Sequence, residues 1–383
     1  MTVDGAWFVR NLGYDPVQQP PPNQASDSRK APKLSAQEDL QREIIDFDSD
    51  GPEGKAFFSL STATGLSKFT DIPWPPGLAP TTAAAAGGTA GGPLPGADIL
   101  VVTWTVDEGH ALSRVLTPGK DSRNDYVAYT HNFATLSKEF QKGSPALQAG
   151  RLGAYWSTTI HGKSVLVFKS DSHLSQDGPQ VPNLQVWKQI IDEIKPKLVL
   201  TTGTGGGIGS KFEVGDVIVS PIVHFDCIKK FKAKFGSEPP FSSSPPKTAH
   251  FATAAKLFRA NSAQLPKDNT RSPQIVNVGE KDVASSVVTT DFFGFDTSDN
   301  YYKLQGLGGL SEMGDAVLGV VCSQLGASAP RWLAVRNVSD PQISSAGTTL
   351  EQQANMAAQI YKGFGRWSTV CSAIVCWALI AAE

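Results

Sequence analysis

The stretch from Lys197 to Ser220, KLVLTTGTGGGIGSKFEVGDVIVS, constrains the fold more than any other part of the chain. Its apolar run Leu198 to Leu200 has strand length and lacks polar alternation, which suits a strand covered on both faces in a parallel sheet. Glycines follow at Gly203, Gly205, Gly206, Gly207 and Gly209. They leave a backbone with little side-chain cover and free access to positive φ. A loop at the carboxyl end of a buried strand is where an α/β sheet places its ligand.

Two other interpretations apply to the same stretch. The glycines could form a tight turn in a Gly-rich hairpin, with no role in binding. A dinucleotide-binding G-x-G-x-x-G fingerprint fits less well, because Ile208 stands at the third glycine position and no helix pattern follows it. The stretch alone does not distinguish a ligand-binding loop from a hairpin, so features elsewhere in the chain are needed.

Composition narrows the function classes. The chain of 383 residues carries 34 basic and 36 acidic side chains, so no basic excess indicates a nucleic-acid partner. The four cysteines, Cys227, Cys322, Cys371 and Cys376, show neither metal-ligand spacing nor a disulfide framework, which favours a reducing cytosol. We expect a cytoplasmic protein.

No segment predicts export or membrane insertion. The N-terminus MTVDGAWFVRNLGYDP lacks a basic start followed by an apolar core, so we expect no signal peptide. The longest apolar run, Cys371 to Ala382, is too short to span a bilayer and predicts a buried final helix. We therefore expect no contact with a membrane.

Residues 1–95 differ from the rest and are predicted to be an N-terminal extension. Pro20, Pro21 and Pro22 interrupt regular structure, and the capping-box pattern at Ser35 opens a helix that runs to about Phe47. The low-complexity segment TTAAAAGGTAGGPLPGA, residues 81–97, is typical of a flexible linker. Aromatic residues nevertheless predict that parts of the extension pack on the main domain or on a partner chain: Trp7, Phe8, Phe57, Phe58 and Trp74.

Residues 96–383 alternate strand and helix patterns. The predicted strands are 99–104, 164–168, 198–200, 216–223, 274–278, 286–289 and 332–338, and the predicted helices are 108–116, 183–194, 311–325 and about 350–377. This alternation predicts a single three-layer α/β domain with a mixed, mostly parallel central sheet. Residues 227–271, rich in Lys, Ser and Pro, predict an irregular insertion that serves as a lid or functional loop or is disordered.

Four short stretches place polar side chains at predicted strand ends or helix starts. They are Thr103 to Glu108, the Gly-rich loop with Thr204, Glu312 to Asp315, and Arg336 to Asp340. Singly, each carboxylate is most often a cap, a turn residue or a solvated charge. Together they bring acids to one edge of one sheet, which is how an α/β enzyme assembles acid and base roles.

These stretches carry a resemblance. An acid near a strand end, then TGTGGGIG and VGDVIVS, then SEMGDA and VRNVSD, resemble the purine nucleoside phosphorylase/nucleosidase superfamily, and most closely the 5′-methylthioadenosine/S-adenosylhomocysteine nucleosidases. The order and spacing of the motifs are kept from about Asp98 to the C-terminus. The resemblance implies the phosphorylase/hydrolase-like fold, no metal or organic cofactor, and a homo-oligomer that acts on a small-molecule purine nucleoside or nucleotide.

The resemblance also implies roles for single residues. Asp340 matches the acid at N7 of the leaving purine, and Ser339 orients it. Glu108 matches the carboxylate that activates the attacking water, and Glu312 matches a second acid near that water. The remaining matches are binding residues: Thr204, Gly205 and Gly206 on the nucleophile side of the ribose, Met313 under the sugar, and Phe293 stacked on the base.

One position separates the two reaction types of the superfamily. Its phosphorylases tend to carry a phosphate-binding Arg two residues before the first glycine of the loop, where this chain has Thr201. A threonine supplies neither a charge nor a fork of donors. We therefore expect water as the nucleophile and a free base, adenine by preference, as product; a phosphate-dependent phosphorylase is the alternative.

Gly314 departs from the resemblance. The family pattern is E-M-E, and its second Glu accepts hydrogen bonds from the ribose hydroxyls, whereas this chain has glycine there. Losing a charge-assisted hydrogen bond costs about 1.5–3 kcal/mol. Asp315 is about 100° away on a helix and does not substitute. The alternatives are a changed substrate preference or a non-catalytic nucleoside-binding protein on the same fold.

Lysines and histidines complete the set of candidates. Lys229, Lys230, Lys232 and Lys234 in the insertion would suit the phosphates of a nucleotide, although a solvated basic loop is the commoner outcome. His110 follows Glu108 closely, and a helix-surface position is predicted for it. None of the six histidines shows ligand spacing, so no metal site is predicted.

Overall fold

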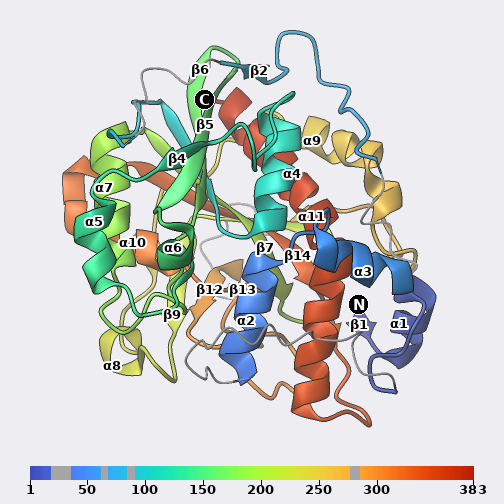
Figure 1. Ribbon diagram of the computed structural model, residues 1–383. Helices are drawn as coiled ribbons and strands as arrows, with labels where there is room; N and C mark the ends of the chain where they lie inside the picture. The colour runs from blue at the N-terminus through green and yellow to red at the C-terminus, as the bar shows by residue number, and fades with distance from the viewer. Residues whose placement is uncertain (19–35, 62–67, 84–90, 277–284) are drawn as a thin grey trace.

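A computed structural model describes residues 1–18, 36–61, 68–83, 91–276 and 285–383, and within these ranges one large sheet organises the molecule (Figure 1). This sheet has 13 strands among the described residues. In chain order they are β2 (Thr81–Thr82), β3 (Ile99–Thr103), β4 (Val127–Tyr129), β5 (Gly153–Ile160), β6 (Lys163–Ser170), β7 (Leu198–Gly207), β8 (Val217–Ser220), β9 (Ile222–Asp226), β10 (Phe241–Ser242), β11 (Ile275–Val276), β12 (Val287–Thr290), β13 (Leu310–Glu312) and β14 (Arg331–Asp340).

The sheet is mixed, and its centre is parallel. Strands β6, β3, β7 and β14 lie side by side in parallel, and β9, β12 and β13 form a second parallel set. The sets join where β13 pairs antiparallel with β7. Antiparallel pairs also attach β5 to β6 and β8 to β14. The α/β prediction with a mixed central sheet is confirmed.

Helices cover both faces of the sheet. They are α1 (Gly5–Leu12), α2 (Ala36–Asp46), α3 (Pro52–Leu60), α4 (Val106–Leu116), α5 (Phe133–Leu136), α6 (Pro145–Ala149), α7 (Asn183–Ile194), α8 (Lys232–Phe235), α9 (Phe251–Leu257), α10 (Asp315–Leu325) and α11 (Leu350–Ala381). Alternate residues of β3 show the three layers, because Val101 joins the apolar cluster of α4 and α11 while Leu100 joins that of α7 and α10. Burial of both faces explains the unbroken apolar runs in these strands.

The last helix, α11, is a core element. It extends to Ala381, beyond the predicted end at about Trp377. By length and composition it could cross a membrane, but its most apolar window is 100% buried inside the protein. A core helix passes the same length and composition test, so the predicted buried final helix is confirmed.

The aromatic residues singled out in the N-terminal region pack on the α4 and α11 face. Trp7, Phe8, Phe57 and Phe58 belong to the same apolar cluster as α11, and the rings of Trp74 and Trp377 lie 4.8 Å apart. A two-stranded parallel sheet joins β1 (Thr2–Val3) to β15 (Gln342–Ile343). The predicted packing of the aromatic residues on the main domain is confirmed.

Figure 1 shows α2 in front of the region where β7 and β13 end, beside α11. The predicted start of α2 at Ser35, the three prolines at 20–22 and the centre of the predicted linker at 84–90 lie outside the described residues. The division at residue 95 stays a prediction.

Three predictions about local structure were wrong. The glycines do not form a loop directly after the strand, because β7 continues through Gly207 between two partner strands. Glu312 ends strand β13, and the helix begins only at Asp315. The insertion at 227–271 is not irregular throughout, since it contains α8, β10, α9 and short 3₁₀ turns.

Candidate active site

Three neighbouring strands, β13, β7 and β14, deliver polar residues of the predicted site. In the parallel pair β14–β7, Val338 lies opposite Gly205 and Asp340 opposite Gly206, with a register shift between them. On the other side of β7, Ser311 of β13 lies opposite Gly206. The parallel pair β7–β14 brings its carboxyl ends to one edge of the sheet, and Glu312 reaches the same glycines from the antiparallel strand β13. The stretches Glu312 to Asp315 and Arg336 to Asp340 therefore lie on either side of the glycines of β7.

The glycines permit close approach. Gly203 has φ +137°, and a Cβ there would lie 2.4 Å from Oε1 of Glu108. A Cβ on Gly205 would lie 2.2 Å from the Leu310 side chain. Both distances are shorter than real Cβ contacts, so side chains at these positions would push the acid and the neighbouring strand away. Gly203 and Gly205 therefore permit the close approach of Glu108 and of strand β13 to β7.

Glu108 is held by hydrogen bonds to both carboxylate oxygens. Oε1 accepts from the amide and the hydroxyl of Thr204, both at 2.8 Å. Oε2 accepts from the Thr103 hydroxyl at 2.7 Å and from the amides of Trp104 and Thr105 at 3.1 and 2.9 Å. Glu108 also forms a capping box with Thr105 at the start of α4. These bonds join α4 to β7.

The same contacts keep Glu108 ionised. Burial acts to raise its pKa, but Arg336 and the donors from Thr105, Thr204 and Thr103 outweigh burial, so the net shift of the Glu108 pKa is downward. Glu108 is thus a fixed negative charge beside the glycines.

Glu312 has a different electrostatic environment, although it is also buried. Its Oε1 accepts from the Thr289 hydroxyl and, at 2.9 Å, from the amide of Asp315; its Oε2 accepts from the amide of Gly314 at 2.6 Å. Burial, and then the charge of Asp315, raise the pKa of Glu312 to about 7, against the opposing effect of Arg336. A carboxyl group with this pKa can exchange a proton near neutral pH.

Arg336 is the buried cation that connects these acids. Its guanidinium donates to both oxygens of Asp315, lies 3.3 Å from Oε2 of Glu312, and sits 4.7 Å from the centre of the Trp104 ring. Asp315 therefore neutralises Arg336 and does not replace the missing acid at Gly314. The sequence places Arg336 at the start of the fourth stretch but does not reveal these partners.

Asp340 is the most isolated of the acids. Its Oδ1 accepts from the Ser339 hydroxyl at 2.7 Å, and burial raises its pKa to about 7. At neutral pH a substantial fraction of Asp340 is therefore protonated and able to donate. Ser339 stands next to it as expected.

One open cavity is lined by Glu108, Glu312, Arg336 and Asp340, whereas Asp315 is not among its lining residues. Its lining includes every residue predicted for the site: Glu108, Thr204, Gly205, Gly206, Phe293, Glu312, Met313, Ser339 and Asp340. Thr201, which stands where a phosphorylase arginine was sought, is buried within β7 and does not line the cavity.

Other lining residues were missed from the sequence. Ile44 and Ile45 come from α2, His173 from the segment after β6, and Tyr361 from α11. Tyr361 donates to the Thr105 hydroxyl at 2.7 Å. None of these residues lies in a recognisable motif, and only the signal of a helix starting near Ser35 could have drawn attention to α2.

Lys229 and Lys230 do not reach this cavity. They line a separate cavity of about 420 Å³ with Gln37, Gln41 and Asp291. Lys229 Nζ donates to the Gln37 side chain at 2.6 Å, and Lys230 Nζ donates to the Ser175 carbonyl at 3.2 Å. The predicted use of these lysines for the phosphates of a substrate in the main cavity is not supported by their position.

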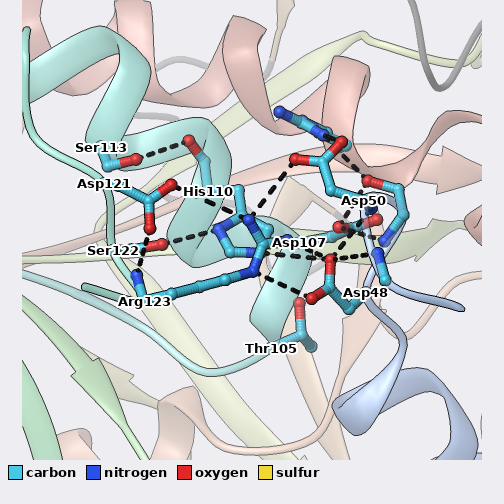
Figure 2. A network of polar contacts seen from close by, with 12 residues as sticks. Asp48, Asp50, Thr105, Asp107, His110, Ser113, Asp121, Ser122 and Arg123 are labelled. Carbon is cyan, nitrogen blue, oxygen red and sulfur yellow. Dashed lines mark hydrogen bonds and ion pairs between the residues drawn. The ribbon is translucent and has the colours of Figure 1, made fainter.

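His110 is buried, so its predicted place on the helix surface was wrong. It belongs to a polar network behind Glu108, with Asp107, Asp48 and Arg123 (Figure 2). Among the described residues, Asp48, Asp107 and His110 bring possible metal-ligating atoms within 4.8 Å of one another. Arg123 already donates to both oxygens of Asp48. This guanidinium supplies the positive charge that a metal ion would otherwise contribute.

A family model described as the phosphorylase superfamily matches residues 126–365. No curated protein sequence matches the chain.

Several solved structures are similar in shape. The 5′-methylthioadenosine/S-adenosylhomocysteine nucleosidase of Neisseria meningitidis, in complex with methylthio-immucillin-A, is 17% identical, with a TM-score of 0.45 and coverage of 75% of this chain and 100% of the other. Futalosine hydrolase of Helicobacter pylori is 16% identical, with a TM-score of 0.43 and coverage of 73% and 96%. A nucleosidase-like protein of Borrelia burgdorferi bound to adenine is 17% identical, with a TM-score of 0.43 and coverage of 74% and 98%.

Proposed function

Because the chain belongs to the phosphorylase superfamily, we propose that it cleaves the N-glycosidic bond of a purine nucleoside or nucleotide with water and releases the free base, adenine by preference. One observation carries the proposal: Asp340, a buried acid with its pKa raised to about 7, shares a single cavity with Glu108 and Glu312. A purine anion is a poor leaving group, so a positioned acid that is protonated near neutral pH is what this reaction needs.

We assign the acid role to Asp340 and the flanking charges to Glu108 and Glu312. Asp340 donates its proton to N7 of the departing purine, and Ser339 holds the other carboxyl oxygen. The sugar becomes oxocarbenium-like as the bond breaks, and the permanently charged Glu108 stabilises the developing positive charge. Glu312, with its pKa of about 7, is the better proton acceptor for the attacking water.

Phe293 and Met313 provide the apolar surfaces for base and sugar. Thr204 uses both its amide and its hydroxyl to hold Glu108, so it acts on the nucleophile side through that carboxylate. Gly205 and Gly206 contribute a backbone without side chains, which lets the substrate lie close to β7.

Water is favoured over phosphate by the charges in the cavity. Arg336 is the one arginine among its described lining residues, and Asp315 and Glu312 occupy it. A phosphate nucleophile would enter beside two or three carboxylates without a free cation, and burying an unpaired anion is costly. The alternative, a phosphorylase, requires Arg336 to leave Asp315.

An assay of base release tests the proposed reaction. The protein is incubated with adenosine, 5′-methylthioadenosine, inosine, AMP and ATP, with and without phosphate, and free base is measured. We expect base from at least one of them without phosphate, and a loss of about 10²–10⁴ in rate for Asp340→Asn. Release that requires phosphate would make the protein a phosphorylase. Nucleoside binding without turnover, unaffected by Asp340→Asn, would instead support a non-catalytic binding protein.

Two further properties are proposed with this function. The four cysteines are free and buried, which is compatible with the reducing cytosol expected from the sequence. A homo-oligomer is expected from the resemblance, and light scattering of the purified chain tests it.

A further inference from the structure

The cavity has a wall that the motifs do not supply. Ile44 and Ile45 of α2 line it, and they are only 5% and 2% exposed. Both residues precede the segment 126–365 that matches the family model. This side of the cavity therefore comes from the chain's own N-terminal region.

The segment after α2 is hydrogen-bonded to Asp107, the residue before Glu108. Oδ1 of Asp107 accepts from the amide and the hydroxyl of Ser49, at 3.0 and 2.8 Å. Arg366 of α11 donates to the Ser49 hydroxyl at 3.0 Å and to Asp50 at 2.8 Å. Asp107 immediately precedes Glu108. The first turn of α4 therefore carries Glu108 and also binds the segment that follows Ile44 and Ile45.

Further ion pairs hold α2 and the segment after it on both sides. Arg123, from the loop after α4, pairs with Asp48 and lies 3.5 Å from Asp50. Lys362 of α11 pairs with Glu43. Several partly buried charge pairs on one short segment restrict its movement more than isolated surface pairs would. The wall is a built part of the site.

His173 adds a polar group to the cavity lining. Its ring is buried, and Nε2 accepts no hydrogen bond from, and donates none to, the residues that the structure describes. Burial lowers the pKa of His173 to about 3, so the imidazole is neutral at physiological pH. A buried polar atom without a partner is costly, and a ligand in the cavity can supply the missing hydrogen bond.

The charges of the cavity lining restrict which ligand groups can lie against Ile44, Ile45 and His173. Arg336 is already paired with acids, His173 is neutral, and Glu108 stays negative. Lys229 and Lys230 line the second cavity, together with residues from the earlier part of α2. A phosphate monoester in the main cavity would therefore find no free cation among the described lining residues.

We propose that α2 and His173 form, within a single chain, the recognition wall for an uncharged and partly apolar portion of the substrate, so that the enzyme accepts nucleosides and rejects 5′-phosphorylated nucleotides. The proposal rests on the proposed function and narrows it. Ile44 and Ile45 contact the apolar surface of the ligand, and His173 Nε2 takes one hydrogen bond from or to an uncharged group.

Steady-state kinetics test the wall by comparing nucleosides with a 5′-phosphorylated nucleotide as substrates. We expect kcat/KM for adenosine or 5′-methylthioadenosine to exceed that for AMP by at least about a hundredfold, because nothing pairs with the phosphate. Ile45→Ala should raise KM for the preferred nucleoside by about tenfold with kcat little changed, as for lost apolar contact. His173→Ala should raise KM about threefold to tenfold. The control is Asp39→Ala, an exposed position on the same helix, which should match the wild type.

AMP turnover equal to that of the nucleosides would overturn the proposal, and so would wild-type KM values in both Ile45→Ala and His173→Ala. Because Ile45 is buried, Ile45→Ala could fail to fold. In that case a measurement on the wild-type protein tests the wall instead. Hydrogen–deuterium exchange is followed with and without adenosine, 5′-methylthioadenosine or adenine, and we expect protection of residues 40–50 and of the segment around His173.

The two measurements separate the wall from the proposed function. Protection of both segments without base release would contradict the enzyme and leave the wall standing. Base release with neither segment protected would leave the enzyme and overturn the wall. If none of the three probes binds, the wall as proposed is wrong, and base release from inosine, AMP or ATP then decides the function by itself.

Discussion

Asp340 shows at the scale of one residue how a functional group can oppose stability. Its folded-state pKa of about 7 lies above its ordinary value of 3.8, because burial disfavours the charged form. The folded protein therefore binds this proton more tightly than the unfolded chain does. The favourable contribution is complete below about pH 4 and is lost as the pH rises through about 7.

We predict that Asp340→Asn raises the melting temperature at about pH 8 while it abolishes most activity, since asparagine has no charge to bury. The gain should shrink or vanish at about pH 4, where the wild-type acid is protonated. The wild-type kcat/KM should fall above about pH 7, as Asp340 loses the proton that we propose it donates, and the residual activity of Asp340→Asn should lack that limb. Differential scanning calorimetry and pH–rate profiles measure both effects. An equal shift in melting temperature at both pH values would contradict this account.

Gly314 is a residue whose glycine is not demanded by the backbone. Its φ is −169°, which any residue adopts, and an added Cβ would meet nothing closer than 3.7 Å. We predict that Gly314→Glu folds and lowers KM for a ribonucleoside about tenfold, because a carboxylate there can accept from the ribose hydroxyls. Gly314→Ala is the control and should leave KM unchanged. Equal KM values for the Glu and Ala variants would show that the sugar is bound elsewhere.

The resemblance, carried by short motifs near predicted strand ends, identified much of the candidate site. All nine predicted residues line one cavity, because β14 beside β7 and β13 on its other side bring the motifs together. Arg336 could be seen in its motif but not interpreted, since its role depends on Asp315 and Glu312 as partners in space. His173 and Ile45 carry no local signal, because their place in the cavity is set by contacts distant in sequence.

At the scale of an element, β7 shows why the glycine run was misinterpreted as a loop. Glycine has low strand propensity, so local preference predicts that the strand ends near Gly203. The neighbours β14 and β13 pair with this backbone on both sides and override that preference. The side chains of Glu108 and Leu310 fill the space that a larger residue would need. Such crowding cannot be read from one segment.

We predict that Gly203→Ala is severely harmful. The alanine would have to adopt a φ near +137° and place Cβ 2.4 Å from Glu108 Oε1. Strain of this kind costs about 1–3 kcal/mol, and displacement of Glu108 should reduce kcat about a hundredfold or more. Gly96→Ala, with ordinary φ and its nearest contact at 3.7 Å, is the matched control and should change stability by less than about 0.5 kcal/mol. Urea unfolding and kcat of both variants decide the matter. Unchanged kcat in Gly203→Ala would refute the role given to close approach.

At the scale of the whole molecule, the described part of the N-terminal region shares its core with the rest of the protein. Trp7 is 2% exposed, and its ring lies 6.0 Å from that of Phe364 on α11. Its helix, α1, follows β1, which pairs with β15 near the other end of the chain. The sequence indicated burial for these aromatic residues but not their partners, because contacts between the two ends of a chain leave no periodic pattern.

This shared core predicts a single cooperative unit. Trp7→Ala should lower the free energy of unfolding by about 3–5 kcal/mol, as expected for a buried tryptophan, and should shift the unfolding of the whole chain. Val9, on the same helix, is 52% exposed, so Val9→Ala should change stability by less than about 0.5 kcal/mol. Urea unfolding followed by far-UV circular dichroism and by base release compares the variants. If Trp7→Ala produced a separate early transition while activity and the main transition kept their midpoints, the N-terminal region would be an independent unit. A common shift of both would mean that α1 and the domain that holds the cavity unfold together, so the region before residue 95 that is anchored by Trp7 belongs to the same cooperative unit as the site.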